Sequence, residues 1–136
     1  MNDSRNSAKL RSRLRAVKTK LVRHLLGADY DLSVGWPTAS KMLEINRHYR
    51  QKGEATNILS FALAPDAGEI LLCPELIAPS EVVSLFIHGL LHLKGYGHGS
   101  KMEDAERAAV NFLSSHEQKS RRRTGHRYRR HPSGRL

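Results

Sequence analysis

The chain has 136 residues, of which 39% are hydrophobic, and carries a formal net charge of +10. That length allows one domain with a modest core, and no apolar run is long enough to span a membrane. The single cysteine, Cys73, excludes an internal disulfide and a cysteine-rich zinc site, which fits a reducing, cytoplasmic setting.

The positive charge is concentrated at the two ends of the chain. Residues 1–24 carry eight lysines and arginines against one acid, residues 118–136 carry eight against none, and the middle carries seven against twelve. We therefore expect one domain over residues 1–117 and a basic tail over 118–136 that is disordered when free. The stretch from Lys119 to Arg135 suits contact with RNA phosphates, and a purely solubilising tail is the alternative.

The first predicted element is a helix, because apolar residues recur at steps of three and four. They are Leu10, Leu14, Val17, Leu21 and Leu25. Such a stripe is typical of a helix that packs one face on a core. An arginine-rich start with few acids is also compatible with a mitochondrial transit peptide, which the apolar stripe disfavours.

The next segment predicts strands around a second helix. Alternating apolar residues predict a strand from Tyr30 to Trp36, and an apolar stripe predicts a helix that ends near Arg50. Residues 51–54 are expected to form a loop. Asn57–Ala64 and Gly68–Cys73 predict two further strands, and the Pro-Asp-Ala-Gly sequence that joins them predicts a hairpin.

The segment from Ser80 to Lys94 is apolar nearly all round, which predicts a buried helix. His88 and His92 project from the same face of that helix because they are four positions apart. Gly95 can end the helix in the left-handed conformation, after which the chain can bring His98 back. Three neutral imidazoles that leave a fourth position for water are typical of a catalytic zinc site. Three separate hydrogen-bonded core histidines are the alternative.

A last helix should begin at Ser100, which forms a capping-box pair with Glu103, and should end near Ser115. Its inner side is apolar and carries Met102, Ala105, Ala109 and Phe112.

The histidine spacing, H-x-x-x-H-x-x-G-x-x-H, is that of the metzincin zinc proteases. In that motif a glutamate directly after the first histidine serves as general base, and here Gly89 takes its place. The pattern therefore predicts a metalloprotease-like metal cradle for a different substrate. A peptide metallohydrolase is an alternative that Gly89 disfavours.

Three blocks of the sequence resemble one family, the YbeY endoribonucleases, which are bacterial rRNA maturation factors. The run from His88 to His98 resembles the family signature H-G-x-L-H-L-x-G-Y-D-H. Residues 46–50 and 56–61 resemble its L-N-x-x-Y-R and T-D-V-L-S-F blocks, and residues 68–75 resemble its G-D-I-x-I-C-P-E strand. The order and rough spacing of the blocks agree over about residues 8–115.

The resemblance implies an α+β fold with a small central mixed sheet of three or four strands, about four helices and a buried metal-binding helix. It implies one Zn²⁺ ion held by His88, His92 and His98, and Arg50 matches the family's functional arginine at the active-site cleft.

The resemblance further implies that residues 1–117 form the catalytic domain of a zinc-dependent endoribonuclease. The implied activity is single-strand-specific cleavage in 16S rRNA processing and ribosome quality control, with rRNA and the small ribosomal subunit as partners. A non-catalytic, zinc-braced ribosome or RNA-binding assembly factor is the alternative.

The chain departs from the family pattern at several positions. Gly97 replaces the aspartate that usually precedes the last histidine, which removes a carboxylate that can orient a metal ligand. Asn57 and Glu69 stand where the family usually has aspartate. The stretch between Pro74 and the metal helix is shorter than usual, which predicts a more open wall of the cleft. The arginine-rich tail is not part of the common pattern.

The chemistry expected of Arg50 is to offer two parallel donors to phosphate oxygens and to stabilise the charge of the transition state. Glu75, Glu103 and His116 are candidate general bases, and the sequence singles out none of them. A 2′-hydroxyl of RNA that attacks under metal activation would reduce the need for such a base.

Overall fold

The computed structural model describes residues 2–50 and 56–128, and the side chains of residues 5–48 and 56–115. Within these residues it contains four α-helices, three strands and two short 3₁₀ turns. In chain order they are α1 (Asn2–Leu25), β1 (Asp31–Gly35), α2 (Ala39–Arg50), β2 (Ile58–Ala64), β3 (Ala67–Leu72), η1 (Pro74–Leu76), η2 (Pro79–Glu81), α3 (Val82–Lys94) and α4 (Ser100–Tyr128). This is the predicted α+β fold.

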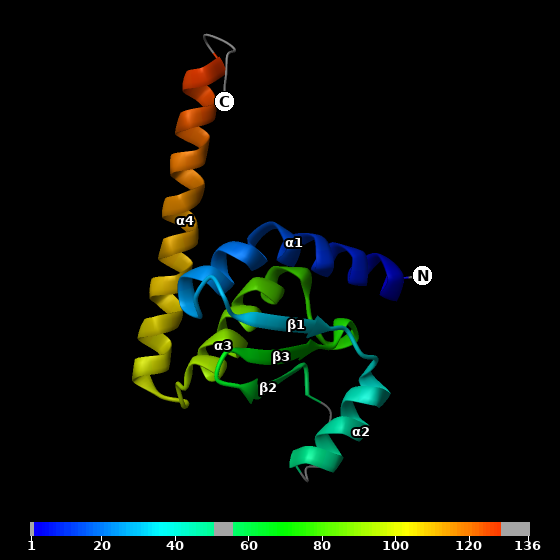
Figure 1. Cartoon of the computed structure of the whole chain (residues 1–136). Coiled ribbons are helices and arrows are strands. Elements are labelled where there is room, and N and C mark those ends of the chain that lie inside the picture. The colour runs from blue at the N-terminus through cyan, green and yellow to red at the C-terminus, as the bar shows by residue number, and fades with distance from the viewer. Residues whose placement is uncertain (1, 51–55, 129–136) are drawn as a thin grey trace.

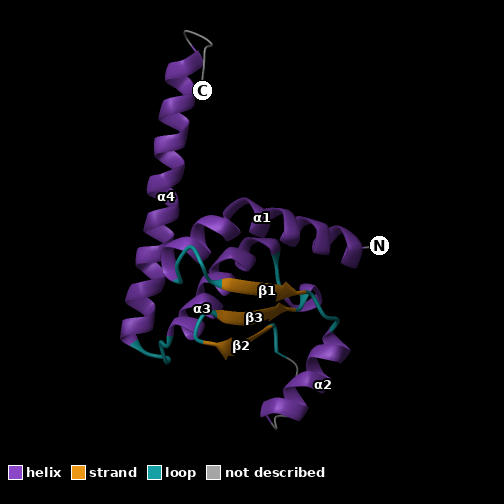
Figure 2. Ribbon diagram, viewed as in Figure 1, coloured by secondary structure: helices purple, strands orange, loops and turns teal. Residues whose placement is uncertain are grey.

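The three strands form one mixed sheet in the order β1-β3-β2 (Figure 1). The central strand β3 runs parallel to β1 and antiparallel to β2. Strands β2 and β3 are joined by the predicted hairpin, whose register shifts between Ala62 and Ala64. Helices α1 and α3 pack against each other beside the sheet. Helix α2 lies beyond the end of the sheet at which β1 finishes (Figure 2).

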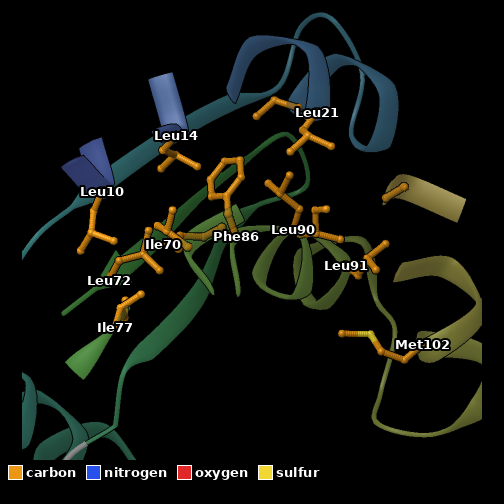
Figure 3. Close-up of a cluster of buried hydrophobic side chains, with 14 residues drawn as sticks. Leu10, Leu14, Leu21, Ile70, Leu72, Ile77, Phe86, Leu90, Leu91 and Met102 are labelled. Carbon is orange, nitrogen blue, oxygen red and sulfur yellow. The ribbon is translucent and has the colours of Figure 1, made fainter. Parts of the chain in front are cut away.

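The main core lies between α1, α3 and β3 (Figure 3). Leu10, Leu14 and Leu21 of the predicted stripe are buried there, which confirms that α1 belongs to the fold. They meet Phe86 and Leu90 of α3 around a common centre. Each such side chain contributes about 1.5–3 kcal/mol on burial. The N-terminal segment is therefore a structural helix in this domain.

Helix α3 approaches the sheet closely at Gly89. A Cβ atom there would lie 3.0 Å from side-chain atoms of Ile58, Ser60 and Ile70, which belong to β2 and β3. Because the glycine has no side chain, the helix backbone can lie directly on the sheet. This contact fixes where His88, the preceding residue, stands relative to β2.

Helix α4 differs from its prediction. It begins at Ser100 as expected, but it continues to Tyr128, so the predicted end near Ser115 is wrong. The first part of the basic segment 118–136 is therefore helical in the structure. Residues 129–136 lie outside the described residues, and so does the predicted loop at residues 51–54. Figure 1 shows the C-terminal half of α4 projecting away from the sheet.

The connection between β3 and α3 consists of the turns η1 and η2. This is the stretch that the sequence comparison with the family pattern predicts to be shortened. Among the residues that the structure describes, no helix is both long and apolar enough to cross a membrane.

Candidate metal centre

The three predicted histidines come from α3 and the turn that follows it. The backbone N–H of Gly95 donates to the carbonyls of His92 and Leu91, and the N–H of Tyr96 donates to Leu91. Gly95 itself has φ 113°, so these bonds form the left-handed helix end that the sequence predicted. The turn then returns the chain and brings His98 to the face that carries His88 and His92.

The three imidazoles converge. Each offers one ring nitrogen to a group whose atoms all lie within 4.8 Å of one another. The ring centroid of His92 lies 4.6 Å from that of His88 and 4.8 Å from that of His98. His88 and His92 are half-buried and His98 is exposed. The group can hold a metal ion and leaves it open to solvent on the side of His98.

The hydrogen-bond partners of the first two rings set their tautomers. Nδ1 of His92 lies 3.0 Å from the backbone oxygen of Tyr96, which can only accept, so this nitrogen carries the hydrogen. Nδ1 of His88 lies 2.6 Å from Oε2 of Glu106, and a carboxylate also accepts. In both neutral rings Nε2 is therefore left with a lone pair and is available as a metal ligand.

The positions of the two Nε2 atoms fit a shared cation. They lie 3.1 Å apart, a separation that suits either a hydrogen bond between the two rings or a cation bound by both lone pairs. Two nitrogens bound tetrahedrally to one Zn²⁺ at its usual bond length are separated by about 3.3 Å. The donor set is three imidazoles, which suits zinc and related transition metals.

Glu106 is the site residue that the sequence reasoning missed. It lies on α4, and its side chain is 32% exposed against 28% for His88. The signal was present in the sequence, because Glu106 falls on the apolar inner side of α4 between the buried Met102 and Ala109. An acid on such a face needs a partner.

The histidines open into a pocket of about 510 Å³ whose other wall is β2 and the residues before it. That wall is formed by Thr56, Ile58, Leu59, Ser60 and Phe61. A second groove of about 830 Å³ lies between α2 and the sheet, and Ser60 and Phe61 line it as well. The metal pocket and the groove are thus adjacent on strand β2.

The close packing at Gly89 also explains why the site has no protease-type glutamate. A Cβ atom at this position would lie 3.0 Å from side-chain atoms of Ile58, Ser60 and Ile70 on β2 and β3. A residue with a side chain after His88 would require these neighbouring side chains to shift by a few tenths of an ångström. The peptide-hydrolase alternative remains disfavoured because Gly89 offers no carboxylate next to the first histidine.

The other residues predicted for the site lie on other elements. Arg50 is the last residue of α2, and its side chain lies outside the described ones, as does that of His116. Glu75 accepts a hydrogen bond from the N–H of Ala39 and so caps α2. Glu103 is exposed on α4. Neither carboxylate lines the metal pocket.

Cys73 is fully buried in a small core cluster with Met42 and Leu59. Burial raises the pKa of its thiol, so the thiolate form that binds metal or attacks substrates is disfavoured. Cys73 is therefore a packing residue.

Comparison with known proteins supports one family. The model of the family described as endoribonuclease YbeY matches residues 2–113. A protein of Delftia acidovorans named endoribonuclease YbeY is 30% identical over 105 residues, which cover 68% of this chain and 69% of that protein. A protein of Cupriavidus metallidurans with the same name is 34% identical over 106 residues, covering 67% of this chain and 54% of that protein.

A solved structure has a similar fold. It is the solution structure of a Thermotoga maritima protein, TM1509, at 23% identity and a TM-score of 0.55. The match covers 83% of this chain and 87% of the other.

Proposed function

Since the chain belongs to the YbeY endoribonuclease family, we propose that it is a zinc-dependent, single-strand-specific endoribonuclease that acts in 16S rRNA processing and ribosome quality control. The observation that carries this proposal is the convergence of three imidazoles beside an open pocket. A cytoplasmic location is part of the proposal, and the buried free Cys73 is compatible with a reducing compartment.

In this proposal His88, His92 and His98 hold one Zn²⁺ ion. When bound, zinc supplies a Lewis acid that polarises the phosphodiester and lowers the pKa of water. In each neutral ring the partner of His88 or His92 holds the hydrogen on Nδ1, so Nε2 is available to the ion, and an uncharged ligand leaves the ion its full charge. Arg50 is assigned the role of donor to the phosphate oxygens, in keeping with its place at the end of the helix that borders the groove.

The shape of the surface supports a single-stranded substrate. The groove and the metal pocket share Ser60 and Phe61, so an extended strand can pass along β2 from one to the other. Phe61 is partly exposed and lines both the groove and the pocket, and base stacking on aromatic rings is common in sites for single strands. The partners proposed are rRNA and the small ribosomal subunit.

The decisive test is His92→Ala, measured by zinc content and by cleavage of single-stranded RNA. We expect both to be lost, because the central ligand of the three is removed. The matched control is His24→Ala, which removes an imidazole that stacks on Phe112 outside the metal centre, and it should keep both. Cleavage by a variant shown to hold no metal would overturn the proposal.

A non-catalytic, zinc-braced RNA-binding factor is the second candidate. The observation that favours it is that, among the described residues, no carboxylate lines the metal pocket to serve as general base. The two candidates differ in their response to a chelator. An enzyme loses RNA cleavage when zinc is removed, whereas an assembly factor supports normal rRNA processing as long as it stays folded and bound.

A further inference from the structure

We propose that Glu106 is the positioning residue of the metal centre, and that it supplies from α4 the carboxylate that is missing at Gly97. The proposal rests on the metal-binding role proposed for the three histidines. It assigns Glu106 no contact with the substrate. It states that Glu106 acts on the metal through the ring of His88.

The contact that carries the proposal is short and joins two helices. Oε2 of Glu106 lies 2.6 Å from Nδ1 of His88, and the two residues are 18 positions apart in sequence. Both side chains are about two-thirds buried. A charge-assisted hydrogen bond in such a setting is stronger and more directional than one at the surface.

The atom that Glu106 contacts decides what it can do. It meets Nδ1, on the side of the ring away from Nε2, and Nε2 is the atom that faces His92. Glu106 is therefore placed to fix the tautomer, orient the ring and increase the basicity of Nε2. Its carboxylate is not placed to take a proton at the metal pocket, whose lining does not include it.

The two helical ligands are held by different kinds of acceptor. His92 donates to the backbone carbonyl of Tyr96, which is fixed by the turn itself. Nδ1 of His88 instead contacts a side chain from another helix. The position of α4 therefore decides how well His88 is oriented.

The turn after α3 leaves the usual place of a carboxylate open. A Cβ atom on Gly97 would meet no heavy atom within 4 Å. Glu106, by contrast, is placed by the core, because Met102 and Ala109 on the same face of α4 are buried at 2% and 1% exposure. The carboxylate is thus supplied by a packed helix rather than by an open turn.

The test compares Glu106→Ala, Glu106→Gln and Glu103→Ala in the full chain. Zinc affinity is measured by competition with a chromogenic chelator. We expect Glu106→Ala to weaken binding by about 10- to 100-fold. Glu106→Gln should keep most of the affinity, since its amide oxygen can still accept the hydrogen bond from Nδ1. Glu103→Ala removes the same charge from an exposed position on the same helix and should leave affinity unchanged.

A second measurement separates positioning from a purely structural brace between α3 and α4. The thermal midpoint of each variant is measured with and without zinc. Positioning predicts a smaller zinc-induced rise for Glu106→Ala, because that rise depends on affinity. An equal loss of midpoint in both states, with affinity like that of Glu103→Ala, would show that Glu106 is only a brace.

The outcomes also distinguish this proposal from the proposed function. If the unchanged protein binds no zinc, or His92→Ala binds it equally well, the metal centre itself is refuted. If zinc affinity is lost in His92→Ala but unchanged in Glu106→Ala, the metal centre is supported and the positioning role is refuted.

Discussion

Arg50 is the last residue of α2, and this helix borders the groove that adjoins the metal pocket on β2. A guanidinium offers two parallel donors to phosphate oxygens, and lysine offers only a point charge. We expect Arg50→Ala to reduce the cleavage rate by about 10²- to 10³-fold, as is typical when a transition-state donor is lost. Arg50→Lys should fall between this variant and the unchanged protein, and zinc affinity should not change in either.

The control for this prediction is Arg47→Ala, which removes an exposed guanidinium from the same helix. Single-turnover cleavage of a short RNA is the measurement. Equal effects of Arg47→Ala and Arg50→Ala would mean that α2 contributes only general positive charge.

The histidine trio could be predicted from sequence because its geometry is local. His88 and His92 are one helical turn apart, and the glycine that ends the helix is three residues beyond His92. Glu106 could not be assigned as the partner of His88 because that contact depends on how α4 packs against α3. The spacing identifies ligands on one element, whereas the residues that orient them come from tertiary packing.

At the scale of the element, the end of α3 offers a matched pair of glycines. Gly95 and Gly97 are both exposed, and a Cβ on either would meet nothing within 4 Å. They differ in backbone conformation, because Gly95 has φ 113° and Gly97 is not among the positive-φ glycines. Alanine in the left-handed region costs about 1–2 kcal/mol. We therefore expect Gly95→Ala to lower the free energy of unfolding by that amount and Gly97→Ala to change it little.

Chemical denaturation of the zinc-free protein measures both variants without interference from metal binding. Gly95→Ala should also weaken zinc binding, because the same turn carries the chain from His92 to His98. Equal stability of the two variants would show that the left-handed helix end is not needed in solution.

The strands and the first three helices follow from the pattern of apolar residues, but the end of α4 does not. Its apolar inner side stops near Leu113, which is why the sequence predicts an end at Ser115. The helix continues because residues 116–124 contain neither glycine nor proline, and lysine, arginine and glutamine are good helix formers. High charge alone was thus a poor guide to where this element ends.

At the scale of the whole molecule, basic residues flank a mildly acidic centre that carries the metal site. Truncation after Ser120 removes seven arginines while leaving residues 1–117, the proposed catalytic domain, intact. For every phosphate of single-stranded RNA that the protein no longer neutralises, the slope of log K against log salt should become shallower by about 0.7. We therefore expect a shallower salt dependence of rRNA binding in the truncated protein, with cleavage of a short, saturating single-stranded substrate retained.

A full-length variant with the same seven residues replaced by glutamine is the matched control, since it removes charge and keeps chain length. If both variants show the same shallower slope, positive charge is what the segment contributes to binding. If neither changes the slope, the tail does not bind phosphates, and α1 is the next basic surface to test, because its Lys9, Arg15, Lys20 and Arg23 are exposed. Substituting those four residues and repeating the salt titration would then locate the RNA on the face of the domain formed by α1.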